Sequence, residues 1–253
     1  MKILKFGGKS LANGEGLQKV IQTIAQKYFN NEPIAVVVSA RGNATDELVI
    51  LLKKAQAKIE FQNDFEQFKK YQFEGLKENI FEEEFTVIQK LLEGVSLLGD
   101  YSEKIKDQVI AYGEILSAKY VAYVLNENSI KAQFVDSRQL IKTDANFGNA
   151  QPIEATSKQN ILEYFVKNGD KVNIITGFIG STVLNETTTL GRNGSNYTAS
   201  LIANYLNAEE FQNYTHVDGI FTANPDLVAD AKKIERLSFN EANELANFGA
   251  QIL

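Results

Sequence analysis

Apolar and polar positions follow one another along this chain in a repeating order of strand, turn and helix. Three short apolar runs, at 3–6, 34–38 and 172–175, each lead into a turn of glycine and small polar residues. Further along, apolar residues recur every three to four positions, the spacing of a helix with one buried face. After the third run, a β-branched strand at 187–189 is expected before the helix begins. The run at 34–38 is apolar throughout, which is typical of a strand buried on both faces of a parallel sheet. The pattern therefore predicts an α/β protein.

The remaining pattern completes the expected elements. Residues 59–99 set aromatic residues among many Glu and Lys, and they are predicted to form two amphipathic helices, an insertion that covers an edge of the sheet. A single long helix is predicted over 102–125, interrupted by Gly113, and the pair Thr45 and Asp46 is expected to cap the helix after 34–38. The other predicted elements are strands at 131–135 and 211–217, a helix at 153–165, and a last helix that opens with a capping box of Ser238 and Glu241 and ends at Gly249. No linker or repeat divides the sequence, so a single domain over 1–253 is expected.

Composition narrows the function classes. Of the 253 residues, 44% are hydrophobic and 23% charged, as in an ordinary globular protein with a full core. There is no cysteine and one histidine, His216, which excludes disulfides, thiolate metal sites and a multi-histidine metal centre. The net charge of −6 argues against nucleic-acid binding, and no apolar run reaches membrane length. The first ten residues lack the apolar core of a signal peptide, so a cytoplasmic protein is expected, with no nucleic-acid or membrane partner and no metal ligands of its own.

The glycine turns are the candidate chemistry. Gly7 and Gly8 follow the first strand, and Gly191 and Gly194 precede the helix after 187–189. The first N–H groups of a helix are unpaired and carry partial positive charge, and glycine lets an anion approach them closely. Arg192 can hold a carboxylate or phosphate through two parallel hydrogen bonds. Taken one at a time, such turns are also consistent with ordinary strand-to-helix connections.

Two standard nucleotide motifs do not fit these turns. The segment Gly8-Lys9-Ser10 matches the end of a P-loop, but Ile3 stands where its first glycine belongs. The pair Gly14 and Gly16 could open a dinucleotide fingerprint, but Lys19 occupies the third glycine position. Neither motif explains the loops.

Three polar residues allow two interpretations each. Glu114 stands beside a glycine in the middle of a predicted helix, where it can face an ammonium group or simply be solvated. Ser39 and Thr45 can contact a ligand or serve as turn and cap residues. Both possibilities stay open on the pattern alone.

Several segments taken together resemble the aspartokinases. They are Lys5-Phe6-Gly7-Gly8-x-Ser10 against the family's KFGGTS, Val38-Ser39-Ala40 with Thr45 against its second loop, Gly113-Glu114 against its GE helix motif, and TTTLGRNGSNYTA at 187–199 against TTTLGRGGSDYTA. Shorter matches are Asp218-Gly219-Ile220-Phe221 and Phe248-Gly249-Ala250. The Asn-Gly form of the loop most resembles the bifunctional aspartokinase–homoserine dehydrogenases. The resemblance thus implies a catalytic domain, with ACT and dehydrogenase regions absent from this sequence.

The resemblance implies the amino-acid kinase fold, a three-layer α/β/α sandwich with a mostly parallel central sheet. The amino acid would bind over the N-terminal half and the nucleotide over the C-terminal half. The implied reaction transfers the γ-phosphoryl group of ATP, with Mg²⁺, to the side-chain carboxylate of L-aspartate, giving 4-phospho-L-aspartate on the way to lysine, threonine and methionine. An aspartate side chain with a pKa of about 3.9 is already ionised at neutral pH, so it needs no general base. The full-length protein is expected to be a homo-oligomer.

Site residues follow from the same resemblance. The implied catalytic residues are Lys5, Gly8 and Arg192. The residues implied to hold aspartate are Ser39, Thr45, Glu114, Arg192, Gly194, Ser195 and Asn196. Those implied to bind the nucleotide are Lys5, Gly7, Gly8, Ser10, Thr215, His216, Phe221 and Lys232.

Departures from the family pattern keep two alternatives open. Lys9 replaces a threonine, Asn196 replaces an aspartate and His216 replaces another aspartate. Asp226 and Gln251 stand where the family has an arginine and a lysine on the nucleotide side, and an anion in place of a cation near a triphosphate is unfavourable. The alternatives are a degenerate kinase domain that binds an amino acid as a regulatory module, or another amino-acid kinase of the same fold.

Overall fold

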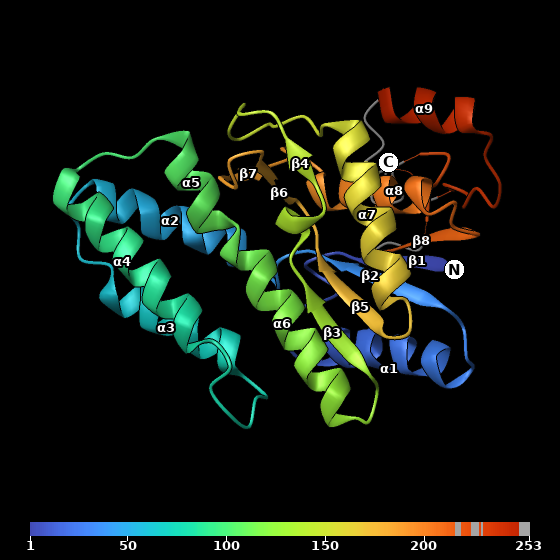
Figure 1. Ribbon diagram of the computed structural model, residues 1–253, viewed down its shortest axis with the longest axis horizontal. Coiled ribbons are helices and arrows are strands. Elements are labelled where there is room, and N and C mark those ends of the chain that lie inside the picture. The colour runs from blue at the N-terminus through green and yellow to red at the C-terminus, as the bar shows by residue number, and fades with distance from the viewer. Residues whose placement is uncertain (216–218, 224–227, 229, 248–253) are drawn as a thin grey trace. The chain divides into compact units, whose positions relative to one another are not determined.

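A computed structural model describes residues 1–215, 219–223, 228 and 230–247. The chain divides into two compact units, Met1–Tyr214 and Thr215–Leu253. The centre of the first unit is a five-stranded sheet in the order β3-β5-β2-β1-β8, and every pairing in it is parallel (Figure 1). Its strands are β1 (Lys2–Phe6), β2 (Ile34–Val38), β3 (Ala132–Val135), β5 (Val172–Thr176) and β8 (Glu210–Tyr214). The predicted parallel α/β sheet is confirmed.

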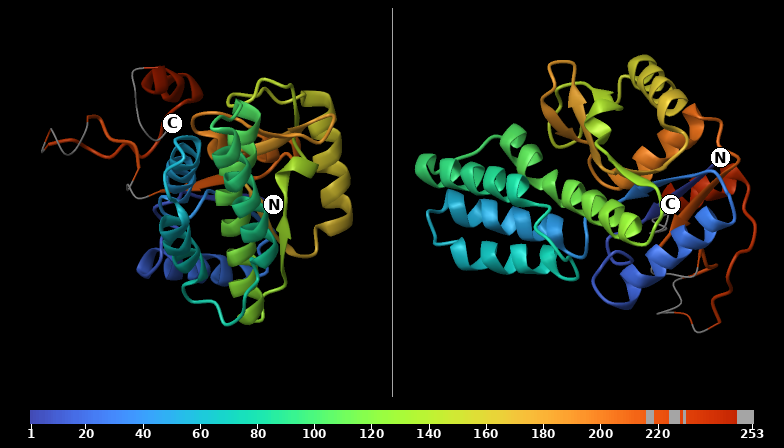
Figure 2. Two further views of the ribbon diagram at one scale, coloured as in Figure 1. Left: turned by 90° about the vertical axis from the view of Figure 1, so that its left-hand side faces the viewer. Right: turned by 60° about the horizontal axis from the view of Figure 1, so that its bottom comes forward.

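Helices cover both faces of this sheet, because alternate residues of its strands are buried on opposite sides. In β2, Ile34, Val36 and Val38 join one core cluster, while Ala35 and Val37 join another. The first cluster includes residues of α1 (Glu15–Phe29) and α6 (Tyr112–Glu127), and the second includes residues of α7 (Glu154–Asn168) and α8 (Gly194–Tyr205). Figure 2 shows these two pairs of helices on the two sides of the sheet. The layers are those of a three-layer α/β/α sandwich.

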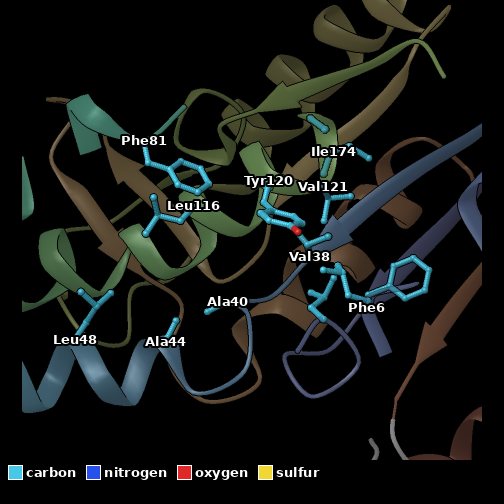
Figure 3. Close-up of a cluster of buried hydrophobic side chains, with 14 of the residues drawn as sticks. Phe6, Val38, Ala40, Ala44, Leu48, Phe81, Leu116, Tyr120, Val121 and Ile174 are labelled. Carbon is cyan, nitrogen blue, oxygen red and sulfur yellow. The ribbon is translucent and has the colours of Figure 1, made fainter. Parts of the chain in front are cut away.

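Tight packing in the first cluster joins the strand ends to α6. Phe6 and Val38, at the carboxyl ends of β1 and β2, lie in the same group as Leu116, Tyr120 and Val121 of α6 (Figure 3). All of these side chains are at most 4% exposed. The carboxyl ends of the central strands are therefore held firmly, and that is where ligands bind in open α/β sheets.

The predicted pair of amphipathic helices in 59–99 is present. It consists of α3 (Gln62–Phe73) and α4 (Glu82–Leu98), which lie beside α2 (Ala44–Gln56) (Figure 1). The aromatic residues at their centre pack against one another with ring centroids 5.3–6.4 Å apart, and all but the partly buried Phe73 are buried: Phe65, Phe68, Phe73, Phe81 and Phe85. These aromatics belong to the same core cluster as Phe6 and Val38 of the sheet, so the pair of helices extends the main core.

The single helix predicted over 102–125 is wrong. The segment forms two helices, α5 (Glu103–Ile110) and α6, which separate at Ala111. The break lets the two helices pack on different sheets, α5 against β7 (Thr187–Thr189) and α6 against β3 and β5. One straight helix could not reach both surfaces.

A second, three-stranded sheet was missed by the sequence pattern, apart from β7. Its order is β4-β6-β7, with β4 at Lys142–Thr143 and β6 at Ile179–Thr182. Asp107 of α5 fastens this sheet to the helix layer, because its carboxylate accepts the Thr189 N–H (2.9 Å), the Thr189 hydroxyl (2.8 Å) and the Gly148 N–H (2.8 Å). Burial raises the pKa of Asp107, and these three hydrogen bonds oppose that rise.

In residues 215–253 the predicted capping box opens α9 (Phe239–Asn247). The Glu241 N–H donates to Ser238 Oγ (3.2 Å), and the Ser238 N–H donates to Glu241 Oε2 (2.8 Å). The predicted end of this helix at Gly249 lies outside the described residues. Among the helices that the structure describes, none combines the length and the apolar character needed to cross a membrane.

Candidate active site

Three turns that are far apart in the sequence meet at one pocket of about 380 Å³ at the carboxyl ends of β1, β2 and β5. The residues that line it come from β1 and the loop after it, the loop after β2 with the start of α2, the start of α6, the loop after β5, and the loop that opens α8. They are Lys5, Gly8, Ser39, Ala40, Gly42, Asn43, Thr45, Asp46, Glu114, Phe178, Gly191, Arg192, Asn193, Gly194, Ser195 and Asn196. The pocket is thus built from the glycine turns singled out in the sequence.

Backbone hydrogen bonds join the first turn to the second at the pocket. The Gly42 N–H donates to the Gly8 carbonyl (3.0 Å), and the Ser39 N–H donates to the Phe6 carbonyl (3.1 Å). A Cβ at Gly8 would lie only 2.7 Å from the Ala40 carbonyl oxygen. Glycine is required there because two stretches of backbone meet with no room for a side chain.

Substituting Gly8 with alanine is expected to lower the free energy of unfolding by about 1–3 kcal/mol, since the added methyl group meets backbone that cannot move away cheaply. Thermal and chemical denaturation measure the loss. The matched control is Gly94→Ala in α4, where a Cβ would meet nothing within 4 Å. That helix variant is expected to gain about 0.5–1 kcal/mol. Equal stabilities for the two variants would contradict the contact proposed for Gly8.

A buried carboxylate stands at the floor of the pocket. Glu114 is 3% exposed, and its Oε1 accepts the Ala40 N–H (3.1 Å), while Oε2 is buried with no partner in the described structure. Burial raises its pKa to about 8, against which the Ala40 hydrogen bond acts. Such a group is neutral in the empty pocket at neutral pH and is ready to ionise against a cation.

Close packing at the start of α6 aims that carboxylate. A Cβ at Gly113 would lie 2.9 Å from Ala40 Cβ and 3.3 Å from Thr45 Oγ1. Gly113 therefore lets α6 approach the second loop closely, which is the close-packing use expected for a glycine within a helix. Thr45 does not cap α2, because that helix begins at Ala44 after Asn43 and no side chain caps it. The expected cap is wrong, and Thr45 instead lines the pocket.

The start of α8, which follows the third turn at 191–193, is packed against the chain after β5. A Cβ at Gly177 would lie 2.6 Å from Ser195 Cβ, so the chain after β5 runs directly against this helix. The Phe178 N–H donates to Thr198 Oγ1 (3.1 Å), whose hydroxyl donates to the Gly194 carbonyl (3.0 Å). The first turn of α8 consequently has a fixed position, and its unpaired N–H groups are available to an anion at the pocket.

Arg192 lies at the tip of this third turn. Gly191 and Asn193 on either side have φ of 74° and 60°, the left-handed region that favours glycine and asparagine. A Cβ at Gly191 would lie 2.3 Å from Asn149 Oδ1, so this position also excludes a side chain. The two left-handed residues leave Arg192 exposed at the rim of the pocket.

The second cation of the pocket is Lys5. It belongs to β1, is 8% exposed, and has a pKa lowered by burial. A Cβ at Gly7 would lie 3.4 Å from Lys5 Nζ, and the Gly7 N–H donates to the Tyr214 carbonyl (3.2 Å). Gly7 therefore lies beside the ammonium group without lining the pocket. An anion that reaches the Lys5 ammonium group would oppose the lowering of its pKa and be attracted strongly, because little water remains there.

The structure brings most of the predicted site residues together. Nine line the one pocket: Lys5, Gly8, Ser39, Thr45, Glu114, Arg192, Gly194, Ser195 and Asn196. Gly7 and Ser10 belong to the loop after β1 but do not line the pocket. Thr215, Phe221 and Lys232 belong to the second unit, and His216 lies outside the described residues, as do Asp226 and Gln251. Their proposed roles stay predictions.

Some lining residues were missed from the sequence. Phe178 is one of them. Its φ of 68° is unusual for a phenylalanine, and the neighbouring sequence does not predict it. Asn43 and Asp46 are others, although they stand in the same polar loop as Ser39 and Thr45 and could have been included on that ground. Among the described residues, no group of three or more His, Asp or Glu is placed to hold a metal ion.

Known proteins share this architecture. Lysine-sensitive aspartokinase 3 of Escherichia coli is 33% identical over 99% of this chain and 57% of its own length. A bifunctional aspartokinase/homoserine dehydrogenase 2 of Arabidopsis thaliana is 29% identical over 98% of this chain and 28% of its own. The chain spans about half the length or less of the curated relatives it matches.

The fold agrees with these relatives. The crystal structure of E. coli aspartokinase III in complex with aspartate and ADP superposes with a TM-score of 0.89 and 32% identity, over all of this chain and 57% of that one. A model described as the amino acid kinase family matches residues 1–253. The chain belongs to the amino acid kinase family.

Proposed function

We propose that this protein is an aspartate kinase, which transfers the γ-phosphoryl group of ATP to the side-chain carboxylate of L-aspartate. The observation that carries the proposal is the convergence of three glycine turns, Lys5 and Arg192 on one pocket. The E. coli structure that this chain resembles is a complex with aspartate and ADP, which supports the same pair of ligands here. The product, 4-phospho-L-aspartate, would serve lysine, threonine and methionine synthesis.

Phosphoryl transfer requires that the two substrates are aligned and that the charge on the phosphates is neutralised, and the residues of the pocket would do both. The aspartate side chain is ionised at neutral pH, so no residue has to remove a proton from the nucleophile. Lys5 at the end of β1 would neutralise charge on the transferring phosphoryl group, and the Gly8 loop would let the phosphates approach the backbone. The Gly194 N–H already donates to the Gly191 carbonyl (3.1 Å), so the next N–H of α8, that of Ser195, would hold the remaining negative charge.

On the amino-acid side, two groups of opposite charge would fix the substrate. Glu114 would receive the ammonium group at the floor, and Arg192 would hold a carboxylate at the rim. Ser39, Thr45 and Asn196 would add hydrogen bonds from the pocket wall. A small molecule with one ammonium and two carboxylates fits this arrangement of charges.

Nucleotide binding and Mg²⁺ are the finer parts of the proposal. Thr215, His216, Phe221 and Lys232 are proposed to contact the nucleotide. In the second unit, the Thr222 N–H donates to the Lys232 carbonyl (2.9 Å), so Phe221 and Lys232 belong to two short segments that pair with each other. The scarcity of clustered carboxylates among the described residues fits an Mg²⁺ held mainly by phosphate oxygens and water, and the ion would supply further charge neutralisation.

Binding of aspartate is expected to release close to one proton per site at pH 7. The native pKa of Glu114, about 8, lies above its ordinary value of 4.5, so the empty pocket holds the proton at pH 7 and an arriving ammonium group displaces it. The folded, empty protein favours the protonated form of Glu114. The free energy of unfolding is therefore expected to fall as pH rises from about 4.5 to about 8. Calorimetric titrations in buffers of different ionisation enthalpy measure the proton. Glu114→Gln should remove the buffer dependence, and a wild-type enthalpy independent of buffer would contradict the assignment.

The proposed activity is tested by trapping its product. With ATP, Mg²⁺ and hydroxylamine, the protein should form aspartyl hydroxamate and ADP in equal amounts, and only when L-aspartate is present. ADP release without hydroxamate, or hydroxamate from a different amino acid, would overturn the proposal. A protein that binds aspartate but does not bind Mg-ATP would instead be a regulatory module that has lost nucleotide binding. Homo-oligomerisation and a cytoplasmic location remain predictions of the same proposal.

A further inference from the structure

A completely buried arginine stands directly behind the pocket. Arg41 is 0% exposed and is among the largest fully buried side chains of the described chain. Among the described residues no carboxylate forms an ion pair with it, and its Nε is buried without a partner. Burial lowers its pKa. The carboxylate of Glu74 attracts Arg41 only from a distance, without a direct contact. A buried cation with no directly paired carboxylate is unfavourable, and an apolar side chain of similar size would be expected to stabilise the fold more.

Four residues hold the guanidinium group instead of a carboxylate. Nη1 donates to the Gln72 carbonyl (3.1 Å), and Nη2 donates to Asn13 Oδ1. The guanidinium carbon lies 3.6 Å from the centre of the Tyr120 ring and 5.6 Å from that of Tyr71, both within range of a cation–π interaction. These contacts join the loop after β1, helix α3 and helix α6 at one point.

The two neighbours of Arg41 in the chain are parts of the pocket wall. The Ala40 N–H donates to Glu114 Oε1, and the Gly42 N–H donates to the Gly8 carbonyl. Both Ala40 and Gly42 line the pocket, while Arg41 does not. A Cβ at Gly42 would lie 2.5 Å from the Tyr71 hydroxyl, so the backbone itself is pressed against the residues that hold the guanidinium.

We propose that Arg41 is a positioning residue of the active site: anchored between Tyr120 and Tyr71, it fixes the Ala40 and Gly42 amides that orient Glu114 and the Gly8 loop. Helices α3 and α6 thereby support the substrate pocket as well as covering the sheet. The kinetic part of this inference rests on the proposed function. The structural part, the fixing of the two amides, does not.

Arg41→Ala tests the anchor by removal and rescue. The variant should raise KM for aspartate about ten-fold at a temperature where it is fully folded, the loss expected for a buried cation–π and hydrogen-bonded anchor. A second pocket, of about 480 Å³ and lined by Asn13 and Tyr120, offers a route to the space left behind. Millimolar guanidinium should therefore restore much of the wild-type KM, while equal sodium chloride should not. A purely structural role would lower the melting temperature without changing KM.

Tyr120 provides a second test that does not depend on Arg41→Ala folding. Tyr120→Leu removes the ring from the guanidinium and should raise KM for aspartate by a similar factor, whereas Tyr120→Phe keeps the ring and should lie much closer to wild type. The matched control is Tyr123→Leu, one turn further along α6 and without a contact to Arg41 among the described ring contacts. An identical KM for Tyr120→Leu and Tyr123→Leu would overturn the inference.

Amide hydrogen exchange separates this inference from the proposed function. In Arg41→Ala, or in Tyr120→Leu if the former does not fold, the Ala40 and Gly42 amides should exchange about ten-fold faster than in the wild type. If the wild type forms no aspartyl hydroxamate, the proposed function fails while the exchange result still decides the role of Arg41. Unchanged exchange at both amides would refute the positioning role whatever the enzyme's substrate.

Discussion

Replacing Lys5 with methionine is expected to lower kcat for aspartyl phosphate formation by about 10²–10³-fold, the loss typical of one preorganised charge-stabilising group. Lys5 is nearly buried at the end of β1, and its ammonium group is the cation that reaches the pocket beside the Gly8 loop. Methionine keeps an unbranched apolar side chain, one atom shorter than that of lysine, and removes the ammonium group with its charge. Steady-state kinetics with saturating aspartate and ATP measure the change.

The control for this variant is Lys2→Met on the same strand. Lys2 pairs with Glu32 (2.9 Å) at the opposite, partly exposed end of β1, where a surface ion pair contributes little. It should keep wild-type kcat and a melting temperature close to that of the wild type. If Lys5→Met and Lys2→Met lose activity equally, the loss comes from general disruption of β1 and not from a charge at the reaction centre.

Replacing Arg192 with alanine is expected to raise KM for aspartate about 100-fold, because two charged hydrogen bonds to a carboxylate are removed. The side chain is exposed at the pocket rim, so the fold should be unaffected. Kinetics at varied aspartate, with circular dichroism and thermal denaturation alongside, test both statements. Arg236→Ala, at an exposed position in the second unit, is the control for loss of an arginine. Wild-type aspartate affinity in Arg192→Ala would show that this residue does not hold the substrate.

Much of the central sheet could be predicted from the sequence, because its three inner strands, β1, β2 and β5, are buried on both faces. The unbroken apolar run of β2 has no other simple explanation, and each of its five residues is buried. The glycines were equally informative. Gly8 and Gly113 each stand where the added Cβ would be less than 3.0 Å from another atom; the sequence marks the first as a turn open to an anion and the second as a break in a helical pattern.

The elements that escaped prediction lack a periodic signal. Strands β4 and β6 are two and four residues long and are rich in threonine, serine and glycine, so neither alternation nor an apolar run marks them. The break at Ala111 is set by where α5 and α6 pack, and an alanine in a helical pattern gives no warning of it.

Support behind the site was likewise hidden from the sequence. Aspartate in an amphipathic helix is usually solvated, but Asp107 is fully buried. The sequence does not reveal this, because its hydrogen-bond partners at Gly148 and Thr189 lie 41 and 82 residues away. Arg41 stands in a polar loop and would be expected to face water. Only the folded chain shows it enclosed by side chains from two helices.

The central claim is that three glycine turns form one site for aspartate and the ATP phosphates. A crystal structure of the protein with L-aspartate and a non-hydrolysable ATP analogue tests it most directly. We expect the aspartate side-chain carboxylate to face the terminal phosphate inside the pocket, with Lys5 near that phosphate, the aspartate ammonium group on Glu114, and Arg192 on a carboxylate. Aspartate or the phosphates bound elsewhere, with this pocket empty, would contradict the account.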